Sequence, residues 1–336
     1  MVIEARTPSR IDLAGGTLDI YPLYLLMEDG LTINMGITVG SYVRVGTRDD
    51  REVHITSQDT GASLSAPTAE ELETGGPLDI VARAIRFYDP KAGLDVTCRN
   101  DAPRGSGLGA SSSLLIATCG ALRHLNGLEL TDEQFVLYAA NLETQNVRVP
   151  VGKQDYYAAL YGGINAITFG VGGDSVEQIG QDEGFRRELE RRLILCFTGE
   201  PRHSGATNWS MFRAYIDDVG DTRASLNRIK ETARHMRAAV EACDFEAFAA
   251  ALAEEWDNRQ RLADGVCTPQ IARLVDAAHE AGAAAFKICG AGGGGCGITL
   301  AADGTEGDVA AALEADGARV LRYRIARKGL EVRVGA

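Results

Sequence analysis

The sequence predicts an α+β fold divided into two domains. Its 336 residues exceed the length at which one hydrophobic core usually stops growing. Residues 32–58 alternate apolar and polar side chains, which is typical of antiparallel strands with one solvent-exposed face. After residue 193, strand and helix patterns interleave. We place the boundary at the charged stretch 182–188, although a solvated helix face explains this charge equally well, and so predict domains 1–182 and 183–336.

The first half contains short strand patterns and three helical patterns. Strands are expected at residues 2–8, 93–99, 164–170 and 175–179, and a helix at residues 76–88. Apolar residues with helical spacing from Ala110 to Leu125 predict a second helix. Thr131 and Gln134 form a capping box that starts a third. Glu143 falls at the edge of the apolar stripe of that helix, where a solvated charge is the commoner explanation.

The second half begins with a buried strand pattern at residues 193–199. Helices are expected at residues 226–240, 245–256 and 269–281, strands at 284–288 and 297–300, a helix at 306–315, and final strands at 319–325 and 329–334. The third of these helices has the clearest ends, because Thr268 is a good N-cap, Pro269 suits the first helical position and Gly282 ends the helix.

Composition excludes several classes of function. The chain has 34 basic and 47 acidic residues, a net charge of −13, which argues against nucleic acid or an anionic membrane as a partner. No apolar run reaches about 18 residues and no signal-peptide pattern opens the chain, so we expect a cytoplasmic protein. The seven cysteines include no C-x-x-C and the five histidines show no ligand spacing, which argues against disulfides and against a metal cage built from protein alone.

The stretch 103–118 is the strongest candidate for a ligand site. Gly105, Gly107 and Gly109 allow close approach of the backbone to a ligand, and a run of serines then leads into a helix. A helix N-terminus has unpaired amide N–H groups and a partial positive charge, so it binds phosphate well. An ordinary glycine loop before a serine-capped helix is the alternative.

A second glycine-rich loop, residues 290–295, contains the letters G-x-G-x-x-G. It joins two expected strands, whereas the dinucleotide fingerprint requires a helix directly after the glycines. A G-x-x-x-x-G-K-[ST] loop and the signatures of protein kinases are absent from the sequence. Two glycine loops, with carboxylates and hydroxyls near helix edges, are the inventory that phosphoryl transfer needs.

Three stretches together resemble the GHMP family of small-molecule kinases: residues 7–16 (TPSRIDLAGG), 103–113 (PRGSGLGASSS) and 287–295 (KICGAGGGG). Within that family, Gly15–Asp19, Gly152–Asp155 and Gly162–Gly163 are most similar to the branch of heptose 7-phosphate kinases and galactokinase-related sugar kinases. The resemblance implies an N-terminal domain like ribosomal protein S5 domain 2 and a ferredoxin-like C-terminal domain, with ATP and the acceptor in the cleft between them.

The resemblance also implies roles for individual residues. Asp155 would be the catalytic carboxylate, with Arg10 beside it, and Glu143 with Ser111 or Ser112 would bind Mg²⁺. The ATP phosphates would lie on Pro103, Gly105, Ser106, Gly107, Leu108, Gly109, Ala110, Ser111, Ser112 and Ser113. The acceptor would contact Gly16, Thr17, Asp19, Arg202, Gly292 and Gly293.

Departures from the family pattern bear on the acceptor. Galactokinases have Glu-His where this chain has Gly15-Gly16, and Tyr156 stands where glutamine is common, so galactose is disfavoured and the pocket is altered. A phosphorylated acceptor needs basic contacts, and the candidates are Arg148, Lys153, Arg202, His203 and Lys287.

The sequence therefore predicts an ATP- and Mg²⁺-dependent kinase for a hydroxyl of a sugar or sugar phosphate, acting as a monomer or homodimer. A kinase or decarboxylase of mevalonate-type substrates, and a non-catalytic nucleotide or sugar sensor, are the alternatives.

Overall fold

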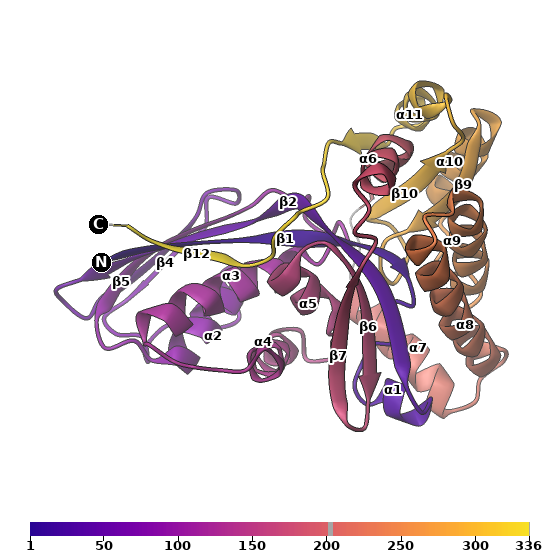
Figure 1. Cartoon of the computed structure of the whole chain (residues 1–336). Helices are drawn as coiled ribbons and strands as arrows, with labels where there is room; N and C mark the ends of the chain where they lie inside the picture. Colours follow the sequence, from indigo (N-terminus) through magenta and orange to yellow (C-terminus); the bar gives the residue numbers. More distant parts are fainter. Residues whose placement is uncertain (201–203, 336) are drawn as a thin grey trace.

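The computed structural model describes residues 1–200 and 204–335, and in this part of the chain the first sheet has eight strands (Figure 1). The sheet is built around β1 (Val2–Ala14) and β2 (Gly30–Arg48), which pair antiparallel. The strand order is β12 (Glu331–Gly335), β1, β2, β5 (Gly93–Asn100), β3 (Val53–Ser57) and β4 (Ser63–Ala66). The other end of β2, residues 30–35, pairs with β6 (Ile164–Gly170), which pairs with β7 (Gly173–Ile179).

Helices cover one face of this sheet (Figure 1). They are α2 (Asp79–Tyr88), α3 (Ala110–Leu125), α4 (Asp132–Val147) and α5 (Gln154–Tyr161), and the short α1 (Leu23–Leu26) lies beside β6. Fully buried apolar side chains from sheet and helices, such as Val43, Ile85, Leu115 and Phe135, form one core cluster. This core fixes α3, α4 and α5, which carry the residues predicted for catalysis.

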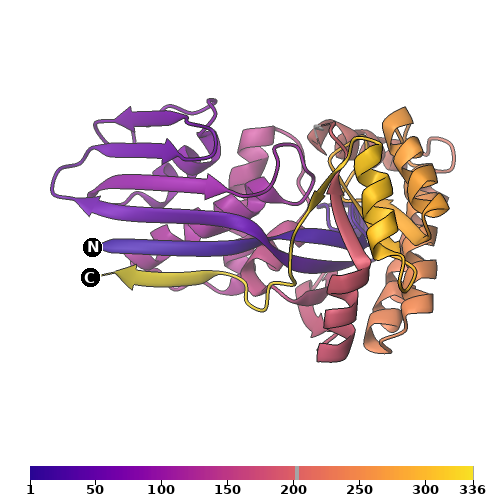
Figure 2. The same cartoon turned by 90° about the horizontal axis from the view of Figure 1, so that it is seen from above.

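A second sheet has the order β11 (Arg319–Leu321), β8 (Leu193–Phe197), β10 (Cys296–Ala301) and β9 (Ala283–Ile288). Its half of the chain also contains α6 (Glu183–Arg192), α7 (Ser204–Ile216), α8 (Thr222–Glu241), α9 (Phe245–Arg259), α10 (Pro269–Glu280) and α11 (Glu306–Ala315). Figure 2 shows this half at one end of the molecule and both termini at the other.

The two halves share a buried core at the far end of β1. Ile11 and Leu13 of β1 belong to the same apolar cluster as Met236 of α8 and Phe248 of α9. The segment of β1 that carries Arg10 therefore lies where the first sheet meets the helices of the second half.

Most of the expected elements are present. The capping box of Thr131 and Gln134 starts α4, and Thr268 caps α10 with proline in its first turn. The glycine-rich loop 103–109 leads into α3, and the loop 290–295 joins strands β9 and β10. No helix of the described ranges combines the length and the apolar character needed to cross a bilayer.

Residues 32–58 form most of β2, which pairs antiparallel with β1, β5 and β6, and β3, which pairs antiparallel with β4 and parallel with β5. Two other expectations need correction. The strand expected at 329–334 does not complete the second sheet, because β12 pairs with β1. Helix α7 follows β8 before the three helices that the periodicity predicted. The division after residue 182 stays a prediction.

Candidate active site

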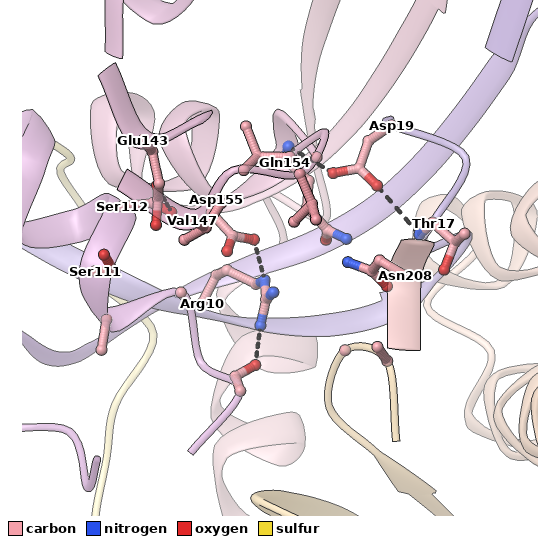
Figure 3. A pocket seen from close by; sticks show the side chains of 18 of the residues that line it. Arg10, Thr17, Asp19, Ser111, Ser112, Glu143, Val147, Gln154, Asp155 and Asn208 are labelled. Atoms are coloured by element: carbon pink, nitrogen blue, oxygen red, sulfur yellow. Dashed lines mark hydrogen bonds and ion pairs between the residues drawn. The ribbon is translucent and has the colours of Figure 1, made fainter. Parts of the chain in front are cut away.

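A cavity of about 530 Å³ lies between the two glycine-rich loops and the N-terminal end of α5 (Figure 3). It collects residues from parts of the chain that are far apart in sequence. The lining residues that the argument uses are Arg10, Thr17, Asp19, the loop from Gly105 to Ser112, Glu143, Gln154, Asp155 and Asn208. The family resemblance had implied roles in phosphoryl transfer for most of these positions.

The phosphate loop forms one wall of the cavity. Gly105, Ser106, Gly107, Gly109, Ala110, Ser111 and Ser112 line it. Helix α3 starts at Ala110, and its N-cap Gly109 has no side chain to bond the first turn, so the amide N–H groups there are available to an anion. Gly109 has φ +70°, and a Cβ at this position would lie 2.8 Å from the Asp155 carboxylate. Glycine is therefore required for the loop to approach Asp155 this closely.

Three predicted members of the loop do not line the cavity. Leu108 is fully buried in the core, and its carbonyl accepts a hydrogen bond from the Arg10 amide at 2.9 Å. Ser113 bonds Thr7 and Ser41 behind the loop. Pro103 precedes the turn, and its carbonyl accepts from the Ser106 amide. These residues support the loop from behind.

Arg10 and Asp155 form an ion pair at the base of the cavity. Arg10 Nε donates to Asp155 Oδ1 at 2.7 Å, and Arg10 Nη1 donates to the carbonyl of Gly107 (Figure 3). The Arg10 side chain is 6% exposed and that of Asp155 18% exposed. The pair joins the start of α5 to the phosphate loop, so Asp155 faces the place where a phosphate on that loop would lie.

Glu143 is buried beside the start of α3. Its Oε2 accepts hydrogen bonds from Ser112 Oγ at 2.7 Å and from Tyr156 OH at 2.6 Å. Burial raises the pKa of Glu143, and the hydrogen bonds from Tyr156 and Ser112 oppose that rise. Carboxylate and hydroxyl oxygens are the ligands that Mg²⁺ prefers, usually completed by substrate phosphates. The donor set of Glu143 with Ser111 and Ser112 fits this ion.

Asp19 and Thr17 form the opposite wall. The two Asp19 oxygens accept from the backbone amides of Thr17 at 3.1 Å and Gln154 at 3.0 Å. Burial raises the pKa of Asp19 to about 6, although the amide of Gln154 lowers it, and the nearby charge of Asp155 adds to the rise. Asp19 is therefore ionised above pH 6 and ready to accept hydrogen bonds from hydroxyl groups.

Beneath this wall lies a network of fully buried charges. Arg259 donates to Glu255 Oε1 at 2.5 Å and to the carbonyl of Gly16 at 2.8 Å. Lys287 Nζ lies 3.0 Å from Asp12 Oδ2 and 3.7 Å from Glu255 Oε2. Although burial alone would raise the pKa of Asp12, Lys287 and two arginines lower it. The network links β1, α9 and β9 and holds the Gly16–Thr17 turn from below.

Three of the remaining predicted acceptor contacts, Gly16, Gly292 and Gly293, do not line the cavity. Arg202 lies outside the described residues, and so does His203. Gly290 and Ala291 line the cavity, while Gly292 and Gly293 lie against the 265–266 turn. Gly16 lies behind Thr17 and does not line the cavity itself.

None of the basic candidates within the described ranges lines the cavity. Lys153 pairs with Asp174 at 2.8 Å, Lys287 is fully buried in the charge network, and Arg148 ends α4. Arg10 is the one positively charged lining residue among those the structure describes. The wall opposite the phosphate loop is therefore polar and acidic.

Sequence reasoning missed two polar lining residues, Gln154 and Asn208. The signal for Gln154 was its place directly before Asp155, in a run of aromatic and small apolar residues. Asn208 lies in α7, a helix that the periodicity did not predict. A second cavity of about 260 Å³ adjoins the first and shares Gly105, Ala110 and Ser111 with it.

Comparison with known proteins finds likeness in both halves of the chain. Residues 78–163 match the description "GHMP kinases N terminal domain" and residues 236–319 match "GHMP kinases C terminal". D-glycero-alpha-D-manno-heptose 7-phosphate kinase of Campylobacter jejuni is 28% identical over 301 residues, covering 87% of each chain. A mevalonate kinase of Thermococcus sibiricus is 30% identical over 356 residues, covering 99% of this chain and 98% of the relative.

Among solved structures, a D-glycero-D-manno-heptose 1-phosphate kinase from Bacteroides thetaiotaomicron superposes on the chain with a TM-score of 0.80. The two are 24% identical, and the match covers 99% of both chains. The likeness extends over both sheets.

Proposed function

The chain belongs to the GHMP kinase family, and on that premise we propose an ATP- and Mg²⁺-dependent kinase for a sugar or sugar phosphate. Family membership makes the chain a phosphotransferase that uses ATP and acts on a hydroxyl group. We propose in addition the class of acceptor, the metal ion and the roles of individual residues. Heptose phosphates are the first acceptors to test, because relatives of this chain carry that name.

One observation carries the proposal: Asp155 lies between the uncapped N-terminus of α3 and the acidic wall at Asp19. A phosphate bound on the α3 amides and a hydroxyl bound at Asp19 would both lie next to the Asp155 carboxylate. Such a placement of two reactants accounts for a large part of the acceleration in phosphoryl transfer.

The residues can then be given roles. Asp155 orients the acceptor hydroxyl and takes its proton while the acceptor oxygen forms a bond to the γ-phosphorus and the bond to the leaving ADP breaks. Arg10 holds Asp155 in place through the 2.7 Å ion pair, and its positive charge stabilises the negative charge of the transferring phosphate. The α3 amides and the loop from Gly105 to Ser112 bind the phosphate oxygens.

Mg²⁺, when bound, neutralises charge on the phosphate oxygens, and Glu143 with Ser111 or Ser112 would hold it. Tyr156 donates to the same Glu143 oxygen as Ser112. These two hydrogen bonds fix the carboxylate toward the start of α3, as outer-shell partners of metal ligands do.

The smaller adjoining cavity is the proposed place of the nucleotide base. It opens next to the phosphate loop through Gly105 and Ser111, and Leu78, Ile80 and Leu114 give it apolar lining. The two faces of an adenine ring are flat and apolar and would fit such a lining.

The acceptor wall favours a polyol over a mevalonate-type acid. Asp19 is a hydrogen-bond acceptor when ionised and so suits hydroxyl groups, whereas a carboxylate near it would be repelled. Arg10, the one positive lining residue of the described part of the chain, is already paired with Asp155. A phosphate on the acceptor would have to lie away from the reacting hydroxyl.

An acceptor panel tests the proposal. Free sugars, heptose 1- and 7-phosphates, mevalonate and homoserine are incubated with ATP and Mg²⁺, and ADP and CO₂ release are measured. ADP release with a sugar or sugar phosphate is the expected result. ADP release only with mevalonate would refute the proposal in favour of a mevalonate kinase. CO₂ formation would instead indicate a decarboxylase, and nucleotide binding without turnover would indicate a sensor.

A further inference from the structure

Gln154 is held by its backbone in a fixed position beside Asp155. Its amide N–H donates to Asp19 Oδ2 at 3.0 Å, and its carbonyl accepts from Asn34 Nδ2 at 2.9 Å. It is the first residue of α5, directly before Asp155. The side chain therefore leaves the backbone from a point that is tied both to the acceptor wall and to β2.

The side-chain amide of Gln154 has no partner among the described residues. The residue is 4% exposed, its Oε1 is buried without a hydrogen bond, and the bonds of Gln154 are made by its backbone. Buried polar groups in native proteins are nearly always hydrogen-bonded, so an unpaired amide needs an explanation.

A structural role does not explain this side chain. Asn165 also has a buried oxygen without a partner, but its Nδ2 donates to Asn34 and to the carbonyl of Gly162, both at 3.0 Å. Asn165 therefore ties β6 to β2 and α5, whereas the side-chain amide of Gln154 makes no hydrogen bond within the described part of the chain. Gly16 leaves room for it, because a Cβ there would lie 3.2 Å from Gln154 Nε2.

The amide lies on the acceptor side of the cavity. In Figure 3 its end points toward Thr17 and Asn208, on the side of Asp155 away from the phosphate loop. A carboxamide offers one acceptor oxygen and two N–H donors, which complements a hydroxyl group that both donates and accepts. An apolar or anionic ligand would leave either the oxygen or the N–H groups unpaired.

We infer that Gln154 determines acceptor specificity by binding a hydroxyl group next to the one that is phosphorylated. This inference rests on the proposed function, and it names the acceptor class as a polyol with neighbouring hydroxyls. Loss of that hydroxyl from the acceptor leaves the buried amide unpaired in the complex. Sites built to bond a hydroxyl reject analogues that lack it far more strongly than apolar pockets reject a missing methylene.

The test compares wild type, Gln154→Met and Gln178→Met with an acceptor found in the panel and with its mono-deoxy analogues. Methionine keeps the length of the side chain without its hydrogen bonds, and Gln178 lies outside the cavity lining, where it donates to the carbonyls of Tyr161 and Gly162. Steady-state kcat/KM is measured for each combination of protein and acceptor, and the Kd of ATP is measured separately for each protein.

Wild type and Gln178→Met should each prefer the parent acceptor to one deoxy analogue by about 10- to 100-fold. Gln154→Met should use that analogue and the parent within about threefold of each other, with the ATP Kd unchanged within about twofold. A purely structural role would lower kcat/KM for all acceptors alike and would keep the preference.

Two results would overturn the inference: Gln154→Met keeps the wild-type preference for every hydroxyl, or its defect lies in the ATP Kd. If Gln154→Met does not fold, Gln154→Asn withdraws the amide by one methylene and must reduce the same preference. A wild-type enzyme that uses no sugar overturns the proposed function as well, whereas sugar turnover with an unchanged preference in the variant overturns this inference alone.

Discussion

Replacement of Arg259 by methionine should destabilise the protein by about 3–5 kcal/mol, because it leaves a buried charge without its partner. Arg259 and Glu255 are both 0% exposed, and Arg259 reaches Glu255 through two nitrogens, at 3.0 and 2.5 Å. After the substitution Glu255 would retain Lys287 at 3.7 Å, and Lys287 is shared with Asp12 at 3.0 Å. Two carboxylates would then face one cation in the core.

The double variant Arg259→Met/Glu255→Met is the matched control. It removes both charges and leaves the Lys287–Asp12 pair, so the free energy of unfolding should return to within about 1–2 kcal/mol of wild type. Urea unfolding gives these values, and unchanged slopes would show that the native and unfolded states are comparable. A single variant within 1 kcal/mol of wild type, or a double variant no more stable than the single, would refute the argument.

The double variant also distinguishes the effect of Arg259 on stability from its effect on acceptor binding. Arg259 also donates to the Gly16 carbonyl at 2.8 Å, next to Thr17, which lines the cavity and is a predicted acceptor contact. The double variant recovers the fold but not this hydrogen bond. Its KM for the acceptor should therefore stay raised by about tenfold, while its Kd for ATP should match wild type.

Two further predictions concern the cavity walls. Because burial raises the pKa of Asp19 from 3.8 to about 6, kcat/KM for the acceptor should fall as the pH drops below 6. The folded protein also binds more protons than the unfolded chain between pH 3.8 and 6. The free energy of unfolding of wild type should therefore fall by on the order of 3 kcal/mol, relative to that of Asp19→Asn, as the pH rises through this window. Urea unfolding measures both values. Gly109→Ala places a methyl group 2.8 Å from the Asp155 carboxylate at φ +70°, so kcat should fall at least tenfold with about 1–3 kcal/mol of strain. Gly127→Ala has the same strain at φ +61° with nothing within 4 Å, and an equal loss of kcat in that variant would contradict the contact argument.

Local sequence signals predicted the parts of the site that depend on local structure. The glycines before Ala110 and the helical spacing after it are enough to predict a helix N-terminus with free amides, and α3 begins there. Glu143 was placed at the edge of an apolar stripe, where a solvated charge is the commoner explanation, and the structure buries it instead. The two-domain fold implied by the family resemblance is confirmed by the solved structure with a TM-score of 0.80.

Features that depend on long-range pairing could not be predicted. The pairing of β12 with β1 joins residues more than 300 positions apart, and nothing in a short strand pattern specifies its partner. No sequence pattern singled out Arg259, and Lys287 was a candidate contact for a phosphorylated acceptor, but tertiary structure buries both side chains completely. Gln154 stands beside aromatic and small apolar residues in the sequence, but that its side-chain amide lacks a partner among the described residues could be seen only in the folded chain.

The most direct test of the central claim is ADP release by wild type and Asp155→Asn with the acceptor panel, with ATP binding measured in parallel. Asparagine keeps the shape of the side chain, but its neutral amide cannot act as a base for the hydroxyl proton. We expect acceptor-dependent ADP release in wild type, a loss of about 10²- to 10⁴-fold in the variant, and an unchanged Kd for ATP. Equal turnover in the two proteins, or no sugar-dependent turnover in wild type, would contradict the account.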